Sequence, residues 1–135
     1  MKVNKDSDCR QENFIVQILR IIDNLWLKNN LDLKLMTYKV FPIDLNVGYV
    51  EYIYSSNLYN IKISSGVGGT LDREIIIKHL RCTSSDDASS SYELTFNEKT
   101  DNFIKSLAGY CVVTCVFGVA NRITKNLLIK NNGIF

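Results

Sequence analysis

The sequence contains no uninterrupted apolar segment of about 18 residues, the length that a membrane-spanning helix requires. Its first ten residues, MKVNKDSDCR, are charged rather than apolar, which argues against a secretory signal. The formal net charge is only +2, too small to indicate a nucleic-acid partner. These absences predict a cytoplasmic protein with no transmembrane segment and no nucleic-acid partner.

Residues that commonly bind metals are also sparse, with four cysteines and one histidine in the chain. Cys111 and Cys115 are one helical turn apart on an apolar segment that has no histidine beside them. This spacing fits two buried thiols or part of a metal site, and we expect buried thiols in a reducing compartment. His79 is near the end of a predicted helix, where we expect it to be solvated or paired with the helix dipole.

One glycine-rich stretch, SSGVGGT at 64–70, lacks the Gly-Lys-Ser/Thr that completes a phosphate-binding loop. We therefore interpret residues 55–70 as a flexible connector. The polar segment 82–99, with SSDDASSS at its centre, is predicted to be a second, mobile loop.

Hydrophobic periodicity predicts three helices. The first spans about residues 11–29, with apolar side chains at intervals of three and four, Asp8 as its N-cap and the Asn29–Asn30 pair as its stop. The second covers 71–81. The third covers 101–117, begins after Thr100 or Asp101, and is apolar nearly all round, which predicts a helix buried at the centre of its lobe.

Two strands are predicted from alternating and β-branched residues, at 31–41 and 48–54, with a turn at 42–46 between them. After the third helix, Gly118 forms a turn, 120–126 a polar loop, and 127–129 a short β segment that begins a hairpin. The predicted fold class is therefore α+β. The last apolar residues have no evident partners, which predicts a marginally stable chain that tends to associate.

The segment from Ser106 to Leu128 also carries a family resemblance. SLAGYC, then FGV, an Asn-Arg pair and NLL resemble the catalytic-loop region of phosphatidylinositol 3-kinases, whose pattern is C-A-G-Y-C followed by G-x-x-D-R-H-x-x-N. The Asn-Leu-Leu ending resembles the class III enzyme of endosomal sorting and autophagy. The resemblance implies that Asn121 and Ile123 stand where the family has its catalytic Asp and His. Arg122 is kept, and Asn126 stands at the metal-ligand position.

The resemblance extends toward the N-terminus. KDSDCRQEN is similar to the family's G-D-D-L-R-Q-D, so Glu12 takes the place of an Asp that faces the nucleotide pocket. The family's phosphate-binding Lys aligns with Asn4, and Lys2 or Lys5 could replace it only through a change of register. LDLKLMTYKV closely resembles the class III segment N-L-D-L-K-L-T-P-Y-K-V, which implies that Tyr38 lines the inner adenine pocket.

Residues Glu51, Tyr52 and Ile53 occupy the hinge positions whose backbone groups hold the adenine edge in that family. Residues 1–135 would then form part of a phosphatidylinositol 3-/4-kinase catalytic domain, from the end of the N-lobe to the start of the helical C-lobe. In the family, the glycine loop precedes this region, and the Asp-Phe-Gly metal motif follows it. The resemblance implies ATP with Mg²⁺ or Mn²⁺ as cofactors, regulatory subunits as partners, and a location peripheral to endosomal membranes.

Three interpretations of function follow. Asn121 cannot accept a proton as a carboxylate does, and Ile123 carries neither charge nor hydrogen-bonding groups. This favours a truncated, catalytically inactive relative of the class III kinase. Alternatively, the chain is a segment of an active kinase whose remaining parts lie outside it, or a small intracellular interaction domain of kinase ancestry.

Overall fold

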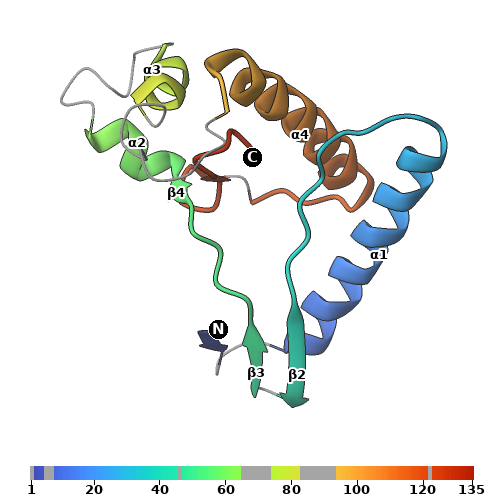
Figure 1. The fold of residues 1–135 in the computed structure, drawn as a ribbon. Helices are drawn as coiled ribbons and strands as arrows, with labels where there is room; N and C mark the ends of the chain where they lie inside the picture. Colours follow the sequence, from blue (N-terminus) through green and yellow to red (C-terminus); the bar gives the residue numbers. More distant parts are fainter. Residues whose placement is uncertain (1, 5–7, 46, 65–73, 83–93, 122) are drawn as a thin grey trace. The chain divides into compact units, whose positions relative to one another are not determined.

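The computed structural model describes residues 2–4, 8–45, 47–64, 74–82, 94–121 and 123–135. The chain divides into two compact units, residues 1–54 and 55–135, and each is described by itself. Among the described residues, the first unit contains one long helix and a three-stranded sheet, and the second contains three helices and a two-stranded sheet (Figure 1). This mixture of helices and strands confirms the α+β class. None of the helices in the described ranges is long and apolar enough to cross a membrane.

Helix α1 (Cys9–Lys28) confirms the first predicted helix. Asp8 is its N-cap, and the Asp8 carboxylate accepts a hydrogen bond from the backbone N–H of Arg10 at 3.0 Å. Asn29 is the C-cap, and Asn30 has a φ of 59°, the left-handed conformation that asparagine tolerates at a helix end. Both ends of this helix are therefore specified by the side chains that the sequence places there.

The sheet of the first unit contains β1 (Lys2–Asn4), β2 (Val40–Asp44) and β3 (Val47–Val50), all antiparallel in the order β1-β3-β2. Helix α1 packs against β2 and β3 (Figure 1) through a core of Cys9, Val16 and Val40, to which Tyr38 and Val50 contribute. A methyl group on Gly48 would lie 2.6 Å from the Cys9 sulfur. Glycine at position 48 therefore permits the close approach of the helix to the sheet.

The predicted strand at 31–41 is wrong over most of its length, because residues 31–39 pair with no strand and β2 begins only at Val40. Asp32 accepts a hydrogen bond from the backbone N–H of Lys34 at 3.0 Å, and Lys34 has a φ of 51°. This local turn breaks the alternation of a strand. The predicted turn at 42–46 is also wrong at its start, since Pro42 to Asp44 continue β2 along an edge of the sheet, where proline is tolerated.

The second strand was predicted to extend to residue 54, but β3 ends at Val50. The reason lies at Glu51, whose backbone N–H donates to the Lys39 carbonyl at 2.8 Å while its carboxylate accepts from the Lys39 N–H, also at 2.8 Å. A side chain thus takes the place of the backbone carbonyl that would continue the ladder.

In the second unit, part of the segment interpreted as a connector is ordered secondary structure. Strand β4 (Ser56–Asn57) is followed directly by helix α2 (Leu58–Ser64), and residues 65–70 lie outside the described part. The Asn57 side chain accepts a hydrogen bond from the Asn60 N–H at 2.7 Å, as an N-cap does. The connector prediction is therefore wrong for residues 56–64.

Helix α3 (Ile75–Cys82) confirms the second predicted helix from Ile75 onward. Residues 71–73 lie outside the described part of the chain. Helix α4 (Phe96–Val116) begins earlier than predicted. Its N-cap is Thr95, in a capping box with Glu98, rather than Thr100 or Asp101. The loop predicted at 82–99 is therefore helical from Phe96 onward, and its centre, 83–93, lies outside the described residues.

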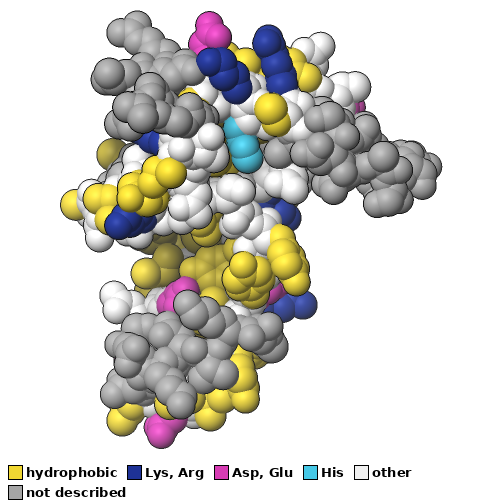
Figure 2. Space-filling view, turned by 90° about the vertical axis from the view of Figure 1, so that its left-hand side faces the viewer, with side chains coloured by type: hydrophobic (Ala, Val, Ile, Leu, Met, Phe, Trp, Pro, Cys, Tyr) yellow, Lys and Arg dark blue, Asp and Glu magenta, His cyan; other side chains and the backbone are white. Residues whose placement is uncertain are grey.

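Helix α4 is not buried all round, contrary to expectation. Ile104, Val112 and Val116 are more than half exposed, and apolar side chains reach the surface elsewhere too (yellow in Figure 2). Cys111 and Cys115 are exposed free thiols, so the prediction of buried thiols is wrong for both. The opposite face is tightly packed at Ser106 and Gly109, as the small residues in the sequence predict.

The predicted hairpin after the polar loop is replaced by a long-range pairing. Strand β5 (Leu128–Ile129) pairs antiparallel with β4, matching Ser56 with Ile129 and Asn57 with Leu128. Ile129 joins Ile61, Ile75 and Leu80 in the core of this unit.

The C-terminal residues also find partners, which corrects the expectation that the apolar end lacks them. The Phe135 ring packs edge-on against Phe103, and its backbone N–H donates to the Ser106 hydroxyl at 2.9 Å. Gly133, with a φ of 86°, lies so close to the Lys99 carbonyl that a side chain there would clash. The end of the described chain therefore packs on the face of α4 formed by small residues.

Candidate functional site

Two of the predicted nucleotide-binding residues contact each other. The Tyr38 hydroxyl donates a hydrogen bond to the Glu12 carboxylate at 2.7 Å in a partly buried setting. The Arg20 guanidinium donates to the Tyr38 backbone carbonyl at 3.0 Å. Helix α1 therefore fixes Tyr38 through both its side chain and its backbone, and links it to the strand that follows.

The three predicted hinge residues differ in their availability. The Glu51 N–H and carboxylate are both engaged with Lys39, as described above. Tyr52 is 59% exposed, and its ring meets Tyr54 edge-on with 5.2 Å between centroids. Ile53 is partly buried. Glu51 and Tyr52 are thus both exposed, and the Glu51 N–H and carboxylate are already hydrogen-bonded.

The predicted phosphate-side position gives little further information. Asn4 ends β1, with its side chain outside the described set, and Lys5 is not described.

The predicted catalytic loop lies in the second unit and is anchored by helix α2. The backbone N–H groups of Leu58 and Tyr59 donate to the carbonyls of Leu127 and Thr124, at 2.9 and 3.1 Å. Because these N–H groups belong to the first turn of α2, the loop satisfies donors that a helix start leaves unpaired. Sequence reasoning missed this support, although Asn57 followed by Leu58 and Ile61 is a readable helix start.

Within the loop, the Asn126 N–H donates to the Ile123 carbonyl at 2.9 Å, which forms a turn. Asn121 and Asn126 are exposed, Ile123 is 55% exposed, and Arg122 lies outside the described residues. The structure therefore brings Ile123 and Asn126 together in one anchored loop. It presents their side chains to solvent.

Lys125 is the charged residue of this loop that lies within the described part of the chain. The Lys125 ammonium lies over the Tyr59 ring, 4.8 Å from its centroid, in a cation–π contact between the loop and α2. The sequence 120–126, ANRITKN, contains no Asp or Glu. The charged residues of the loop are therefore all basic.

The loop supplies at most part of a divalent-metal site, with Asn126 at the position that the resemblance aligns with the family's metal ligand. Mg²⁺ is usually held by one or two carboxylates together with substrate phosphates, and the loop offers only the amide oxygens of Asn121 and Asn126. Within the described ranges, no group of three His, Cys, Asp or Glu side chains could hold a metal ion. We derive no catalytic step through a metal here.

A further pair of groups lies between α3 and α4. The Nε2 atom of His79 is buried without a hydrogen-bond partner, and Lys99 is only 4% exposed. Burial, and secondarily the charge of Lys99, lowers the pKa of His79 below its ordinary value. His79 lies in the last turn of α3, as predicted, but its ring is not freely solvated.

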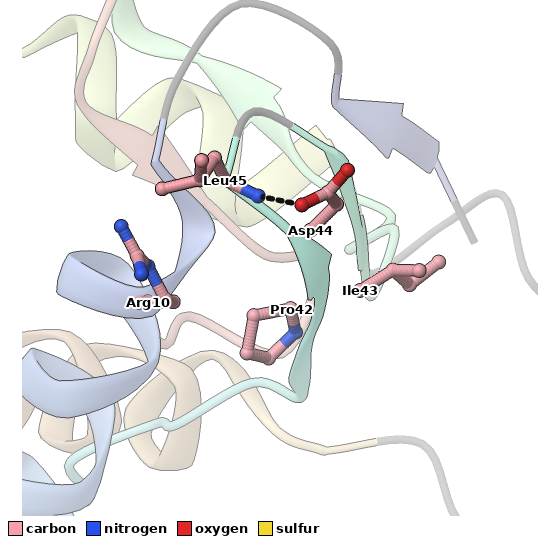
Figure 3. Close-up of a pocket in the computed structure, with 5 residues that line it drawn as sticks. All are labelled: Arg10, Pro42, Ile43, Asp44 and Leu45. Atoms are coloured by element: carbon pink, nitrogen blue, oxygen red, sulfur yellow. Dashed lines mark hydrogen bonds between the residues drawn. The ribbon is translucent and has the colours of Figure 1, made fainter.

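A shallow, open depression of about 280 Å³ lies between the start of α1 and the end of β2 (Figure 3). Its polar groups are already paired. The Asp8 carboxylate binds the Arg10 guanidinium at 2.7 and 2.9 Å, and the Asp44 carboxylate accepts from the Leu45 N–H at 2.8 Å. It contains none of the predicted site residues, and we assign it no role. The residues that line it are Arg10, Pro42, Ile43, Asp44 and Leu45.

The sequence profile of the family described as "Phosphatidylinositol 3- and 4-kinase" matches residues 2–135. The chain belongs to this family. Among similar proteins, phosphatidylinositol 3-kinase piki-1 of Caenorhabditis elegans is 35% identical over 96% of the chain. Phosphatidylinositol 3-kinase pik3 of Schizosaccharomyces pombe is 33% identical over 95%, and phosphatidylinositol 4-phosphate 3-kinase C2 domain-containing subunit alpha of Pongo abelii is 32% identical over 93%.

The chain spans only a small part of these phosphatidylinositol kinases: 8% of piki-1, 15% of pik3 and 7% of the Pongo abelii protein. The comparisons confirm the family inferred from the catalytic-loop motif, whose members use ATP and a divalent metal. The identities to the three relatives differ by only a few percentage points, so the class III assignment stays a prediction.

Proposed function

We propose that this chain is a catalytically inactive relative of the phosphatidylinositol 3-kinases, closest to the class III type. The proposal is supported by the anchored loop, in which Asn121 and Ile123 stand at the positions that the motif resemblance aligns with the family's Asp and His. Neither side chain can exchange a proton with an attacking hydroxyl. General acid–base help contributes about 10²–10⁴-fold.

Nucleotide binding through the first unit is proposed to be weak or absent. Tyr38 and Glu12 satisfy each other, and the Glu51 N–H is bound to Lys39. A ligand that needs any of these groups must first break an existing hydrogen bond, which reduces the net gain of binding.

Partners and location are proposed from the family alone. By analogy with class III kinases, the chain would be cytoplasmic and peripheral to endosomal membranes, in contact with phosphoinositide kinase regulatory subunits. Co-purification of tagged chain from cells, with an unrelated protein of the same size as control, tests this. Absence of any regulatory subunit from the purified material would count against the partner proposal.

The lengths of the relatives favour one alternative: the chain is a segment of an active phosphatidylinositol kinase whose other parts lie outside it. The purified 135-residue chain would be assayed with phosphatidylinositol vesicles, ATP and either Mg²⁺ or Mn²⁺. The Asn121→Asp, Ile123→His double variant would be assayed in parallel. We expect no phosphorylated lipid from the unmutated chain above a boiled control. Metal-dependent product from it would overturn the proposal of inactivity.

A reciprocal substitution separates the loop residues from the effect of length. In a full-length active relative such as pik3, the catalytic Asp and His would be changed to Asn and Ile. We expect activity to fall by at least about 10²-fold. If that enzyme keeps its activity, Asn121 and Ile123 do not explain inactivity and the alternative is favoured.

A further inference from the structure

The elements that support the loop are free of acidic residues. No Asp or Glu occurs after Asp101, and none occurs in residues 52–71, which include β4 and α2. The same elements carry Lys62 on α2 and, around the loop, Arg122, Lys125 and Lys130. The charge of this region is thus of one sign, as expected for a surface that binds anions.

The two acidic residues near the start of α4 are engaged elsewhere. Glu98 accepts hydrogen bonds from Thr95 in the capping box of α4, and Asp101 pairs with Lys105 at 2.6 Å. Within the described part of the chain, neither Lys62 nor Lys125 is in an ion pair. Their charges are therefore not neutralised by the described carboxylates.

The position of Lys125 is restricted rather than freely variable. Its ammonium lies over the Tyr59 ring, and Tyr59 is anchored by its N–H bond to the Thr124 carbonyl. Tyr59 and Lys62 are three residues apart on α2, so both lie on the same face of the helix. The ring holds one side of the ammonium and leaves its remaining donors for a ligand.

We propose that the Lys125 ammonium, held over Tyr59, binds phosphate groups, and that this loop does so without a divalent cation. Lys62 adds a second positive charge, and the exposed amides of Asn121 and Asn126 can donate to phosphate oxygens. Lysine binds phosphate as a point charge, and the loop contains no carboxylate that would repel a phosphate group. The inference rests on the proposed loss of catalysis.

The shared chemistry is a phosphate ester or polyphosphate, which a free nucleotide or a phosphoinositide headgroup could supply. Inorganic triphosphate tests the soluble source without the adenine, and phosphatidylcholine vesicles with and without phosphatidylinositol 4-phosphate test the lipid source. Each probe would be titrated into the whole chain in EDTA and again in excess Mg²⁺. We expect binding in EDTA that is no weaker than binding in Mg²⁺.

Four variants locate the binding. Lys125→Gln removes the charge and should raise Kd about tenfold, the effect of one charge-assisted hydrogen bond. Lys125→Arg should retain most of the affinity, and Tyr59→Leu should weaken binding by releasing the lysine. Lys28→Gln, an exposed lysine at the end of α1, is the matched control and should not change Kd. Thermal melts of each variant exclude unfolding as the cause.

Binding that requires Mg²⁺, binding that Lys125→Gln leaves unchanged, or no binding of either probe would overturn the inference. Binding of only one of the two probes identifies the source of the phosphate group and supports the inference. The kinase assay tests the proposed function independently of phosphate binding. Lipid phosphorylation by the chain would overturn the proposed function. An inactive chain that binds neither probe defeats only this inference.

Discussion

The hydroxyl of Tyr38 and the carboxylate of Glu12 are joined by a 2.7 Å hydrogen bond between residues that are 26 positions apart in the chain. This contact connects the first turn of α1 to the segment that enters β2. Tyr38→Phe removes it and leaves the ring in place. We expect the free energy of unfolding of the first unit to fall by about 1 kcal/mol, measured by urea denaturation. Tyr54→Phe, at a position that is 85% exposed, is the control.

Gly48→Ala should be more damaging. The new methyl group would lie 2.6 Å from the Cys9 sulfur and 3.0 Å from the Phe41 carbonyl oxygen, so α1 and the sheet must separate. Overpacking of this kind typically costs about 1–3 kcal/mol. In a Cys9→Gly background, where the sulfur is absent, Gly48→Ala should cost less stability than it does in the unmutated chain. Equal losses in both backgrounds would show that Cys9 does not limit the space.

The capping box at the start of α4 predicts a local effect. Thr95→Ala removes the hydroxyl that accepts from the Glu98 N–H, and the second unit should lose about 1 kcal/mol of stability. Asn97→Ala, an exposed change in the same turn, should not destabilise it. If amide hydrogen exchange in the first turn of α4 were no faster in Thr95→Ala than in the unmutated chain, the cap would be unimportant.

His79 predicts a dependence of stability on pH. Its pKa in the folded chain lies below the ordinary value of about 6.5 because of burial and Lys99. As pH falls from about 7 toward 5, the unfolded chain binds the proton first, so the unfolded state is favoured and stability decreases. His79→Phe should remove this dependence and also the unpaired Nε2 atom. A melting temperature that decreases equally in both proteins would contradict the assignment to His79.

Local signals were sufficient for α1, where Asp8, a periodic apolar face and Asn30 define the start, the buried side and the end. The same signals exist for α4, since Thr95 and Glu98 form the T-x-x-E pattern of a capping box, but the polar composition around them favours a loop. Helix α2 was missed because the glycines that follow it suggested a loop. A capping pattern was therefore a better guide to these boundaries than composition.

Other features could not be read from the sequence. The left-handed backbone at Lys34 depends on a hydrogen bond from its N–H to Asp32, and lysine gives no signal for it. At the candidate site, the identities of Asn121, Ile123 and Asn126 came from motif spacing. The anchoring of their loop depends on backbone N–H groups of α2, which carry no side-chain signature. The contact between Lys125 and Tyr59 likewise joins residues that are far apart in the chain.

The pairing of β4 with β5 has a kinetic consequence. Ser56 stands near the beginning of the second unit and Ile129 near its end, so most of that unit lies in the loop that this pairing closes. Closing a long loop costs entropy before the contacts that reward it can form, and contacts between distant residues slow folding. The loop that carries Lys125 should therefore become ordered late in folding, after α3 and α4 have formed.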